Sequence, residues 1–332
     1  MATVGVITPV YATKDNQRLS LLQPTLSSVR QQSYPDFVHL IVDDGSTCDV
    51  EGFLQTYSDQ RIRYIRRERN PSDLQTASNA LNFGIDHCLA KSGDVFTRSE
   101  ANDLTAVAFL HSDDMLTSNS VGLRLANIGN GFVHSDMAVF DNHGKVIRIN
   151  KWRGSEKDYL LSAAHYSFNH HTVMWDIEFL RYLKDFVADR YGQTGVFDPL
   201  LSFGEDRDMS LSSIEASIAG GYRHKHLPLV SVYYRCHKNS ISGEQTDPEY
   251  LRAQRNRISQ KHSVPDTNRS KLVTILNRLT SNLPFSLFTF LPEEVKRELR
   301  PIRNCGERFV NERRYGSLTK ELETYLCQLG AC

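Results

Sequence analysis

The chain has 332 residues, and its 39 Lys and Arg residues equal its 39 Asp and Glu residues in number, so the formal net charge is zero. With 40% hydrophobic and 23% charged residues, the composition is that of a folded protein of one large or two ordinary domains. A neutral chain lacks the basic excess that DNA- and RNA-binding proteins usually show, which argues against nucleic acid as a partner.

The sequence contains no pattern for a membrane-spanning helix or a secretory signal. No run reaches 18 apolar residues, and the first 17 residues lack the basic start, the apolar stretch and the cleavage site of a secretory signal. The six cysteines are scattered and include no C-x-x-C, which favours free thiols over a disulfide framework or a zinc site. We therefore expect a cytoplasmic protein.

The first 115 residues alternate between β-branched runs and helical patterns. The runs predict strands at residues 4–8, 39–42, 62–65 and 106–110. Apolar residues at helical spacing predict helices at 19–32, 52–57 and 74–90. This alternation is typical of a Rossmann-like α/β fold, with a mostly parallel central sheet flanked by helices. The polar stretch 91–105 is long for a connection, so we expect a surface insertion there.

Beyond residue 118 the alternation becomes irregular. The pattern predicts further strands at 131–140, 146–149 and 229–234, and helices at 177–183 and 205–219. After about residue 248 only helical patterns remain, at 250–261, 271–279, 292–299 and 317–326. We therefore divide the chain into residues 1–248 and a helical C-terminal region, residues 249–332.

Two acidic pairs follow predicted strands: Asp43 with Asp44, and Asp113 with Asp114. In doubly wound sheets the ligand lies outside the carboxyl ends of the strands. Mg²⁺ is usually bound there by one or two carboxylates together with substrate phosphates, so a nucleotide diphosphate is the natural partner. A turn followed by a helix cap would use the same residues, and this alternative stays open.

Five stretches occur in an order that resembles family 2 glycosyltransferases of the GT-A fold. They are VITPVY at 6–11, SVRQQSYPDFVHLIVDDGST at 28–47, FLHSDD at 109–114, FGED at 203–206 and YYRCHKNSIS at 233–242. The resemblance implies a nucleotide-sugar donor, Mn²⁺ or Mg²⁺ as cofactor, and an inverting displacement. It also implies that residues 1–248 are the catalytic domain, with the donor bound by residues 1–115 and the acceptor by residues 116–248.

The resemblance implies several nucleotide contacts. Pro9, Tyr11 and Asp44 would hold the base, and Asp44 would accept a hydrogen bond from uracil if the donor is a UDP-sugar. Thr76 falls near the next base-contacting position, and Asp113 would contact the ribose. The family's common A-R-N-x-G is changed here, because Leu81 stands in place of the arginine.

The same resemblance implies a metal site. Asp114 would bind the metal, and His111 replaces the first Asp of the common L-D-x-D-D pattern. His111 is expected either to bind the metal as well or to contact the ribose, since imidazole is a softer ligand than a carboxylate. His237 would complete the coordination, and Arg235 would meet the phosphates.

Glu205 and Asp206 stand just before a predicted helix, where they could serve as helix caps. The resemblance favours a catalytic role instead. An inverting transfer needs a carboxylate to take the proton from the acceptor hydroxyl. We assign this role to Asp206, with Glu205 as the alternative. Nearby, His165, His170 and His171 lie where such enzymes form the acceptor pocket, although a polar strand edge would look similar.

Two other functions remain open from the sequence. A metal-dependent nucleotidyltransferase would use similar carboxylates, but residues 8–14 lack the Gly-rich basic loop that it ordinarily shows. The missing G-x-G-x-x-G likewise disfavours a dehydrogenase. A non-catalytic glycan- or partner-binding module retaining the fold is the third possibility.

The zero net charge is the sum of two unlike parts. Residues 1–250 contain 24 basic and 31 acidic residues, a net −7, whereas residues 251–332 contain 15 and 8, a net +7. The basic part includes the apolar segment LPFSLFTFL at 283–291. Its helices are expected either to pack on the catalytic domain or a second subunit, or to contact the inner face of a membrane peripherally. The acceptor is expected to be a glycan, a glycolipid or a protein.

Overall fold

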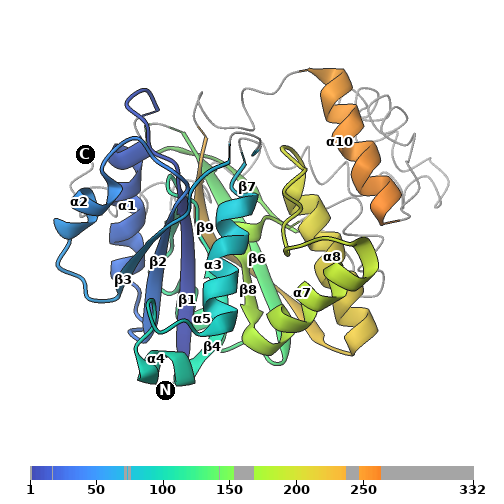
Figure 1. The fold of residues 1–332 in the computed structure, drawn as a ribbon, viewed down its shortest axis with the longest axis horizontal. Coiled ribbons are helices and arrows are strands. Elements are labelled where there is room, and N and C mark those ends of the chain that lie inside the picture. Colours follow the sequence, from blue (N-terminus) through green and yellow to red (C-terminus); the bar gives the residue numbers. More distant parts are fainter. Residues whose placement is uncertain are drawn as a thin grey trace, which may run out of the picture.

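A mixed sheet of nine strands forms the centre of the fold (Figure 1). The structure is a computed structural model, and it describes residues 2–16, 18–70, 73, 76–141, 143–152, 168–236 and 247–262. The strand order is β3-β2-β1-β4-β8-β6-β9-β5, and β7 pairs with β6. The strands are β1 (Thr3–Val10), β2 (Phe37–Asp43), β3 (Ile62–Arg66), β4 (Leu104–Phe109), β5 (Met115–Leu116), β6 (Gly131–Phe140), β7 (Val146–Asn150), β8 (Val173–Asp176) and β9 (Arg223–Arg235).

The sheet has a parallel half and a mixed half. Strands β3, β2, β1 and β4 are all parallel, as the sequence predicts for residues 1–115. In the other half β8 runs antiparallel to β4 and β6, β7 is antiparallel to β6, and only β6 and β9 pair in parallel. The predicted α/β fold is therefore confirmed, with a parallel first half and a mixed second half of the sheet. A parallel neighbour needs a long crossover, whereas β6 and β7 are joined by a short turn.

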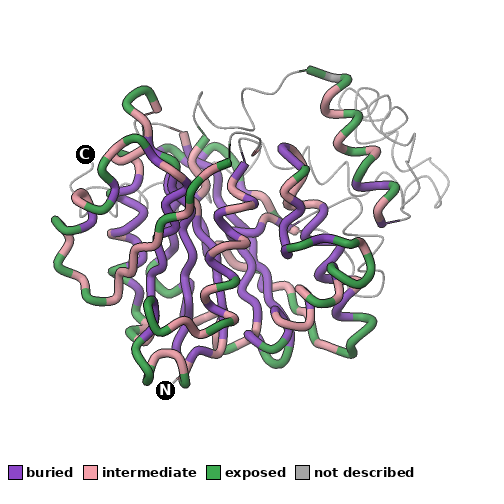
Figure 2. The backbone as a smooth tube through the Cα atoms, in the orientation of Figure 1, coloured by how far each residue is buried: buried purple, intermediate pink, exposed green. Residues whose placement is uncertain are grey.

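Helices cover both faces of the sheet. They are α1 (Arg18–Arg30), α2 (Val50–Gln55), α3 (Ser78–Ala90), α4 (Arg98–Asp103), α5 (Ser120–Leu125), η2 (His170–Thr172), α7 (Ile177–Tyr191), α8 (Glu205–Gly220) and α10 (Pro248–Lys261). Helices α3, α7 and α8 pack on one face, and α1 and α5 pack on the other. The central strands are consequently buried on both sides, as the purple core of Figure 2 shows.

Local chemistry sets several helix ends. The Asp176 side chain accepts hydrogen bonds from the backbone N–H groups of Glu178 and Phe179, and so begins α7. Gly84 allows α3 to approach β1 closely, because a Cβ at this position would lie 2.7 Å from a methyl carbon of Ile7. These contacts explain why α7 begins directly at the end of β8 and why α3 packs tightly on the sheet.

The expected surface insertion at 91–105 is only partly correct. Thr97 and Glu100 form a capping box that starts α4, and both side chains lie near the surface. Val95 and Phe96, however, are each 2% exposed and belong to the main core. The burial of Val95 and Phe96 was not predicted, because most of the residues around them in this stretch are polar.

Helix α10 packs against the start of α8 rather than standing apart from it. Asp208 of α8 is 1% exposed, and it accepts hydrogen bonds from Lys261 Nζ at 2.7 Å and from His262 Nε2 at 2.9 Å. Ile258 is also buried in the core. The first helix of the C-terminal region therefore packs on the domain that precedes it.

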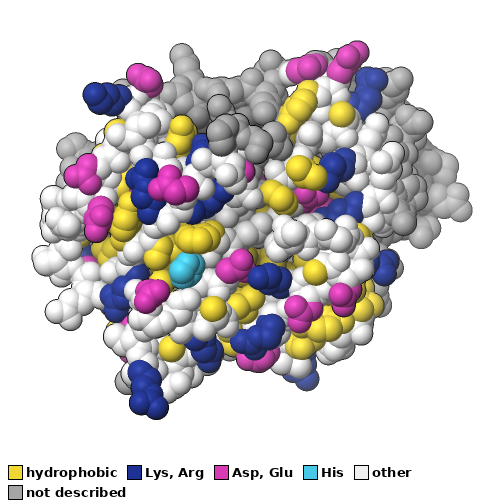
Figure 3. Space-filling view, in the orientation of Figure 1, with side chains coloured by type: hydrophobic (Ala, Val, Ile, Leu, Met, Phe, Trp, Pro, Cys, Tyr) yellow, Lys and Arg dark blue, Asp and Glu magenta, His cyan; other side chains and the backbone are white. Residues whose placement is uncertain are grey.

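The other predicted C-terminal helices, at 271–279, 292–299 and 317–326, lie outside the described residues, as does the apolar segment 283–291. Among the residues that the structure describes, no helix is both long and apolar enough to cross a bilayer. On the face shown in Figure 3, positive and negative side chains of the described part are interspersed, in keeping with the neutral composition.

Candidate functional site

Two adjoining cavities open at the carboxyl ends of the central strands. One, of about 460 Å³, lies beside β1 and β2, and the other, of about 310 Å³, lies beside the start of α8. Arg18, His111 and Asp113 line both cavities. We call them the strand-end cavity and the α8 cavity. Their shared wall means that a molecule in one could touch a molecule in the other.

The strand-end cavity gathers residues that the sequence predicts to bind a nucleotide. Pro9 and Tyr11 reach it from the end of β1, and Asp44 reaches it from the end of β2. Thr76 lies just before α3, and Asp113 follows β4. Because β1 pairs in parallel with both β2 and β4, all three strands deliver their carboxyl ends to the same edge.

The two aspartates at the end of β2, Asp43 within the strand and Asp44 just after it, have different environments. Asp43 is completely buried and acts within the fold: it accepts hydrogen bonds from Ser46 N at 2.8 Å, from Tyr64 Oη at 2.8 Å and from Arg66 at 2.9 Å. It therefore forms the turn that the sequence offered as an alternative.

Asp44 instead lines the strand-end cavity, where it pairs with Arg67. Burial raises the pKa of Asp44 despite this pairing. Arg67 also pairs with Asp73 at 2.5 Å, and the guanidinium of Arg69 lies 4.5 Å from the centre of the Tyr11 ring. These arginines, which the sequence analysis did not identify, hold Asp44 and Tyr11 in place at the cavity.

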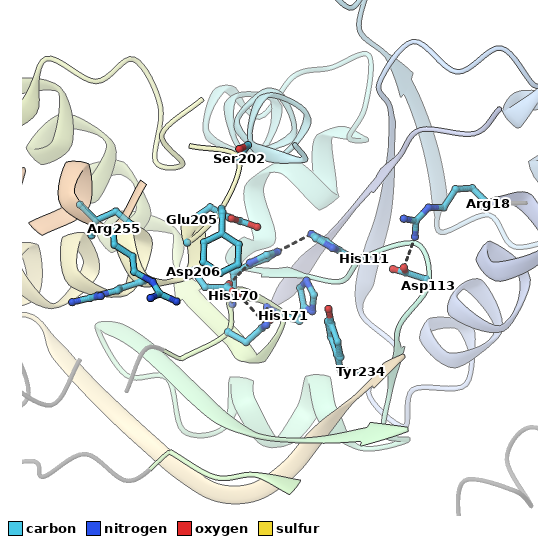
Figure 4. A pocket seen from close by; sticks show the side chains of 15 residues that line it. Arg18, His111, Asp113, His170, His171, Ser202, Glu205, Asp206, Tyr234 and Arg255 are labelled. Carbon is cyan, nitrogen blue, oxygen red and sulfur yellow. Dashed lines mark hydrogen bonds and ion pairs between the residues drawn. The ribbon is translucent and has the colours of Figure 1, made fainter. Parts of the chain in front are cut away.

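The turn after β4 is held by two arginines. Arg235 donates its backbone N–H to Asp114 Oδ1 at 2.8 Å and its Nε–H to the Asp113 carbonyl at 3.1 Å. Arg18 pairs with the Asp113 carboxylate at the junction of the cavities (Figure 4). Arg235 is not part of either cavity's lining, so its expected phosphate contact stays a prediction. His237 lies outside the described residues.

Asp114 and His171 form a buried pair beside His111. Both are 1% exposed, and Nδ1 of His171 lies 2.9 Å from Oδ2 of Asp114. The angles are not those of a hydrogen bond, so neither this oxygen nor either His171 ring nitrogen has a hydrogen-bond partner among the described residues. Burial, and after it the charge of Asp113, raises the pKa of Asp114 well above its usual range. A cation bound beside Asp114 would oppose this shift and favour the ionised carboxylate.

The histidines beside it are in the form that binds metals. Burial, and then the neighbouring histidines, hold the pKa of His111 well below its ordinary value, and burial and His170 do the same for His171. Neutral imidazole is the ligating form. Ligand atoms of His111, Asp113 and Asp114 lie within 4.8 Å of one another, as do those of His111, His170 and His171. The donor set therefore fits a divalent metal ion.

Asp206 lies in the α8 cavity, near the start of α8 (Figure 4). Its Oδ1 accepts a hydrogen bond from the His170 backbone N–H at 2.8 Å and a second from His170 Nδ1, and its Oδ2 accepts one from Asn169 at 3.1 Å. Burial alone would raise the pKa of Asp206. The charge and hydrogen bonds of His170 outweigh burial and lower this pKa to about 2. The low pKa means that the Asp206 carboxylate is ionised at neutral pH, and the 28% exposure of the side chain makes it accessible.

A line of side chains connects Asp206 to the residues after β4. His170 Nε2 lies 2.8 Å from His111 Nε2, so Asp206, His170 and His111 are joined in sequence by hydrogen bonds (Figure 4). The Asp206 charge raises the pKa of His170, although burial opposes this. The predicted catalytic residue is thus connected to the predicted metal site through a histidine.

Glu205 lines the same cavity as Asp206, but its pKa is shifted in the opposite direction. Burial and the charge of Asp206 raise the pKa of Glu205, so it is the more basic of the two carboxylates. Gly204 precedes them with a φ of +85°, and this left-handed conformation turns the chain into α8. A Cβ at Gly204 would lie 2.9 Å from Ile258 of α10. The turn that presents both carboxylates therefore needs glycine.

Helix α10 completes the wall of the α8 cavity. Arg255 and Ile258 line it, and Ser202 in its lining pairs with Tyr250 of α10. Arg255 is exposed, whereas Arg257 pairs with Asp198 at 3.3 Å. The first helix of the C-terminal region thus contributes to the wall of the α8 cavity.

The sequence analysis missed part of this site. It placed His170 and His171 only in an acceptor pocket, and it did not identify Arg18 or Asn169. His165 lies outside the described residues. The one signal available was N-H-H-T before the short β8, a polar cluster directly preceding a buried strand. Trp175 is fully buried, as expected for a core tryptophan.

Comparison with known proteins gives a consistent result. A sequence model described as Glycosyl transferase family 2 matches residues 6–182, more than half of the chain. The GalNAc(5)-diNAcBac-PP-undecaprenol beta-1,3-glucosyltransferase of Campylobacter jejuni is 25% identical over 165 residues, which are 49% of this chain and 46% of that protein. An uncharacterized glycosyltransferase of Rickettsia felis is 28% identical over 166 residues, 50% of this chain and 22% of that protein.

The chain therefore spans less than half the length of these relatives. Among solved structures, S. aureus TarS 1-349 in complex with UDP-GlcNAc is similar with a TM-score of 0.56 and 17% identity, covering 91% of this chain and 78% of that one. At this identity the similarity shows the fold alone.

Proposed function

The chain belongs to glycosyl transferase family 2, and we propose that it moves a sugar from a UDP-sugar to an acceptor hydroxyl with inversion at the anomeric carbon. The observation that carries the proposal is the shared wall of the two cavities. The carboxylate of Asp206 opens into one, the expected nucleotide residues line the other, and His111 and Asp113 lie between them. A sugar bound at this junction would have its anomeric carbon close to both cavities.

The strand-end cavity would bind the nucleotide. Tyr11 offers a ring face and Asp44 offers a carboxylate that can accept the N3–H of uracil. The pairing with Arg67 fixes this carboxylate in one orientation. Asp113 would then accept a hydrogen bond from the ribose. TarS, which was solved with UDP-GlcNAc, has a similar fold, and this supports a uridine nucleotide here.

Asp206 would act as the base. It takes the proton of the acceptor hydroxyl while that oxygen bonds to the anomeric carbon, and the bond from this carbon to the diphosphate breaks at the same time. The hydrogen bonds from His170 and Asn169 hold the carboxylate in position. Attack from the side opposite the diphosphate inverts the configuration. Glu205, one residue away and more basic, is the alternative base.

A divalent ion, Mn²⁺ or Mg²⁺, when bound, would neutralise the charge that develops on the departing diphosphate. Asp114 and His111 would hold it, and His237 remains a predicted ligand. The buried Asp114 oxygen without a hydrogen-bond partner supports this role.

The acceptor would enter through the α8 cavity, beside Arg255 and Ile258 of α10. The Campylobacter relative is named for an undecaprenol-linked glycan acceptor, and this supports a glycan or lipid-linked glycan for this chain. Such an acceptor would bring the protein to the inner face of a membrane.

The test is a panel of nucleotide sugars offered to the purified chain with Mn²⁺, with Mg²⁺ and with EDTA. We expect one UDP-sugar to raise the melting temperature in the presence of metal, and to be cleaved slowly to UDP and free sugar. Release of pyrophosphate would indicate a nucleotidyltransferase, and binding without any cleavage or transfer would indicate a binding module. If no nucleotide sugar stabilises the protein, the proposal is wrong.

A further inference from the structure

We propose that His171 is a metal ligand, and that His171, His111 and Asp114 form a site of two imidazoles and one carboxylate that selects a first-row transition ion over Mg²⁺. The proposal deepens the metal-dependent transfer described above. It rests on that function for the role of the metal, but the presence of the site follows from the contacts of these three residues alone.

The first observation is the set of buried atoms that have nothing to bind. Asp114 Oδ2 and both ring nitrogens of His171 lack a hydrogen-bond partner among the described residues, and both side chains are almost fully buried. A buried polar atom without a partner is unfavourable, because it has lost its hydrogen bonds to water and gained none in the protein. Two of these atoms, Asp114 Oδ2 and His171 Nδ1, are in contact with each other, which is unfavourable unless an ion lies beside them.

The second observation is the distance between two of these atoms. His171 Nδ1 and Asp114 Oδ2 are 2.9 Å apart, without the angles of a hydrogen bond. Two ligands that meet a metal at right angles, each about 2.0–2.1 Å from it, are themselves about 2.9 Å apart. The spacing is therefore that of neighbouring ligands on one ion.

His111 would be the third ligand, because its ligand atoms lie within 4.8 Å of those of His171 in one group and of those of Asp114 in another. Its ring centre is 4.0 Å from that of His171, and its Nε2 contacts His170, which leaves Nδ1 for the metal. A ligating histidine usually donates its other ring N–H to a partner that fixes the ring, and His170 supplies that partner here.

Two nearby groups are excluded. His170 has both ring nitrogens engaged, one with Asp206 and the other with His111. The carboxylate of Asp113 pairs with Arg18. The remaining coordination positions would face the junction of the cavities, where His111 and Asp113 are part of both linings. A diphosphate could fill them.

The ligand set predicts which metal binds. Mg²⁺ requires oxygen ligands in near-ideal octahedral geometry, and imidazole nitrogen suits transition ions. Affinity for such a site rises from Mn²⁺ to Co²⁺. We expect Mg²⁺ to bind at least about tenfold more weakly than Mn²⁺, and Co²⁺ to bind more tightly than Mn²⁺.

The decisive measurement uses the unaltered chain with Mn²⁺ alone, without nucleotide or sugar. Pulsed electron paramagnetic resonance of the bound Mn²⁺ should show coupling to directly bound ¹⁴N nuclei, and titration with Mg²⁺ should displace the ion only at large excess. Bound Mn²⁺ without nitrogen coupling, or displacement by an equal concentration of Mg²⁺, would overturn the proposal.

A set of variants then assigns the nitrogens. H171A should weaken Mn²⁺ binding at least tenfold and reduce the nitrogen coupling, whereas H143A, which removes an exposed histidine, should change neither. UDP binding measured in EDTA reports whether H171A is folded. If H171A folds and binds Mn²⁺ as the unaltered chain does, His171 is not a ligand. Because these measurements omit the donor, a failed transfer assay leaves their outcome unaffected.

Discussion

The two cavities of this protein are built in different ways. The strand-end cavity is lined by residues that directly follow β1, β2 and β4, and the parallel pairing of these strands brings them together. The α8 cavity combines the turn at 169–171, the start of α8 and one face of α10. The first is fixed by strand register, whereas the second depends on contacts between segments that are distant in sequence. We therefore expect substitutions in the two cavities to produce separable effects.

The largest effect is expected in the α8 cavity. Asp206→Asn removes the proton acceptor but can keep a hydrogen bond from Asn169, so we expect kcat for transfer or donor cleavage to fall about 10²- to 10⁴-fold. The dissociation constant for UDP should stay unchanged. Glu205→Gln is the matched control, and a larger loss in that variant than in Asp206→Asn would make Glu205 the base.

The two aspartates at the end of β2 offer a sharper comparison, because Asp44 lines the strand-end cavity and Asp43 is buried beside it. Asp43→Asn disrupts a buried carboxylate that accepts bonds from Ser46, Tyr64 and Arg66, so the free energy of unfolding should fall by about 2–3 kcal/mol. Chemical denaturation followed by circular dichroism measures this. Unchanged stability would mean that this turn does not depend on the Asp43 charge.

Asp44→Asn should have the opposite pattern. Its side chain lies at the cavity, so we expect UDP to bind about tenfold more weakly, corresponding to about 1.4 kcal/mol, with a smaller loss of stability than in Asp43→Asn. Calorimetry with UDP is the measurement. If Asp44→Asn binds UDP normally, the base does not contact this residue.

The smallest effect concerns the attachment of α10. Burial by itself would lower the pKa of His262, which follows α10. Hydrogen bonds with Asp208 and Glu215 outweigh burial and raise this pKa above its ordinary value of about 6.5. Its charge therefore stabilises the folded state fully below pH 6.5, and this stabilisation is lost as the pH rises through the raised pKa. Burial would raise the pKa of Asp208, but His262 and Lys261 lower it. The ionised Asp208 therefore stabilises the folded state fully above about pH 3.8, and this stabilisation is lost as the pH falls through the lowered pKa.

Melting temperatures from pH 5 to pH 9 check this prediction. His262→Gln can keep a hydrogen bond to Asp208 but cannot take up a proton, so the difference in melting temperature between it and the unaltered chain should be largest near pH 5–6 and should shrink as the pH rises. A difference that is constant, or that grows towards alkaline pH, would contradict the account.

The contrast between the cavities also explains what the sequence could predict. Strand ends carry a local signature, because an apolar run followed by acidic residues marks Asp44, Asp113 and Asp114 directly. The elements of the first 110 residues, apart from α4, follow from the periodicity of apolar residues. The family resemblance added Pro9, Tyr11, Thr76 and Asp206, which a single sequence marks only weakly.

The other contacts depend on tertiary structure. Arg18 meets Asp113 across 95 positions in the chain, and His170 meets His111 across 59. Nothing in the local pattern around Lys261 indicates that it binds Asp208 in α8. Strand β8 itself was not predicted, because a four-residue strand carries too little pattern to indicate its presence or its antiparallel direction.

The central claim is that nucleotide binding and proton transfer lie in two cavities that share one wall. It is tested most directly by measuring the UDP dissociation constant and the turnover of the active UDP-sugar in parallel for Asp44→Asn and Asp206→Asn. The account predicts weakened UDP binding in the first variant, and normal UDP binding with turnover reduced at least about 100-fold in the second. Equal loss of UDP binding in both variants, or normal turnover in Asp206→Asn, would contradict it.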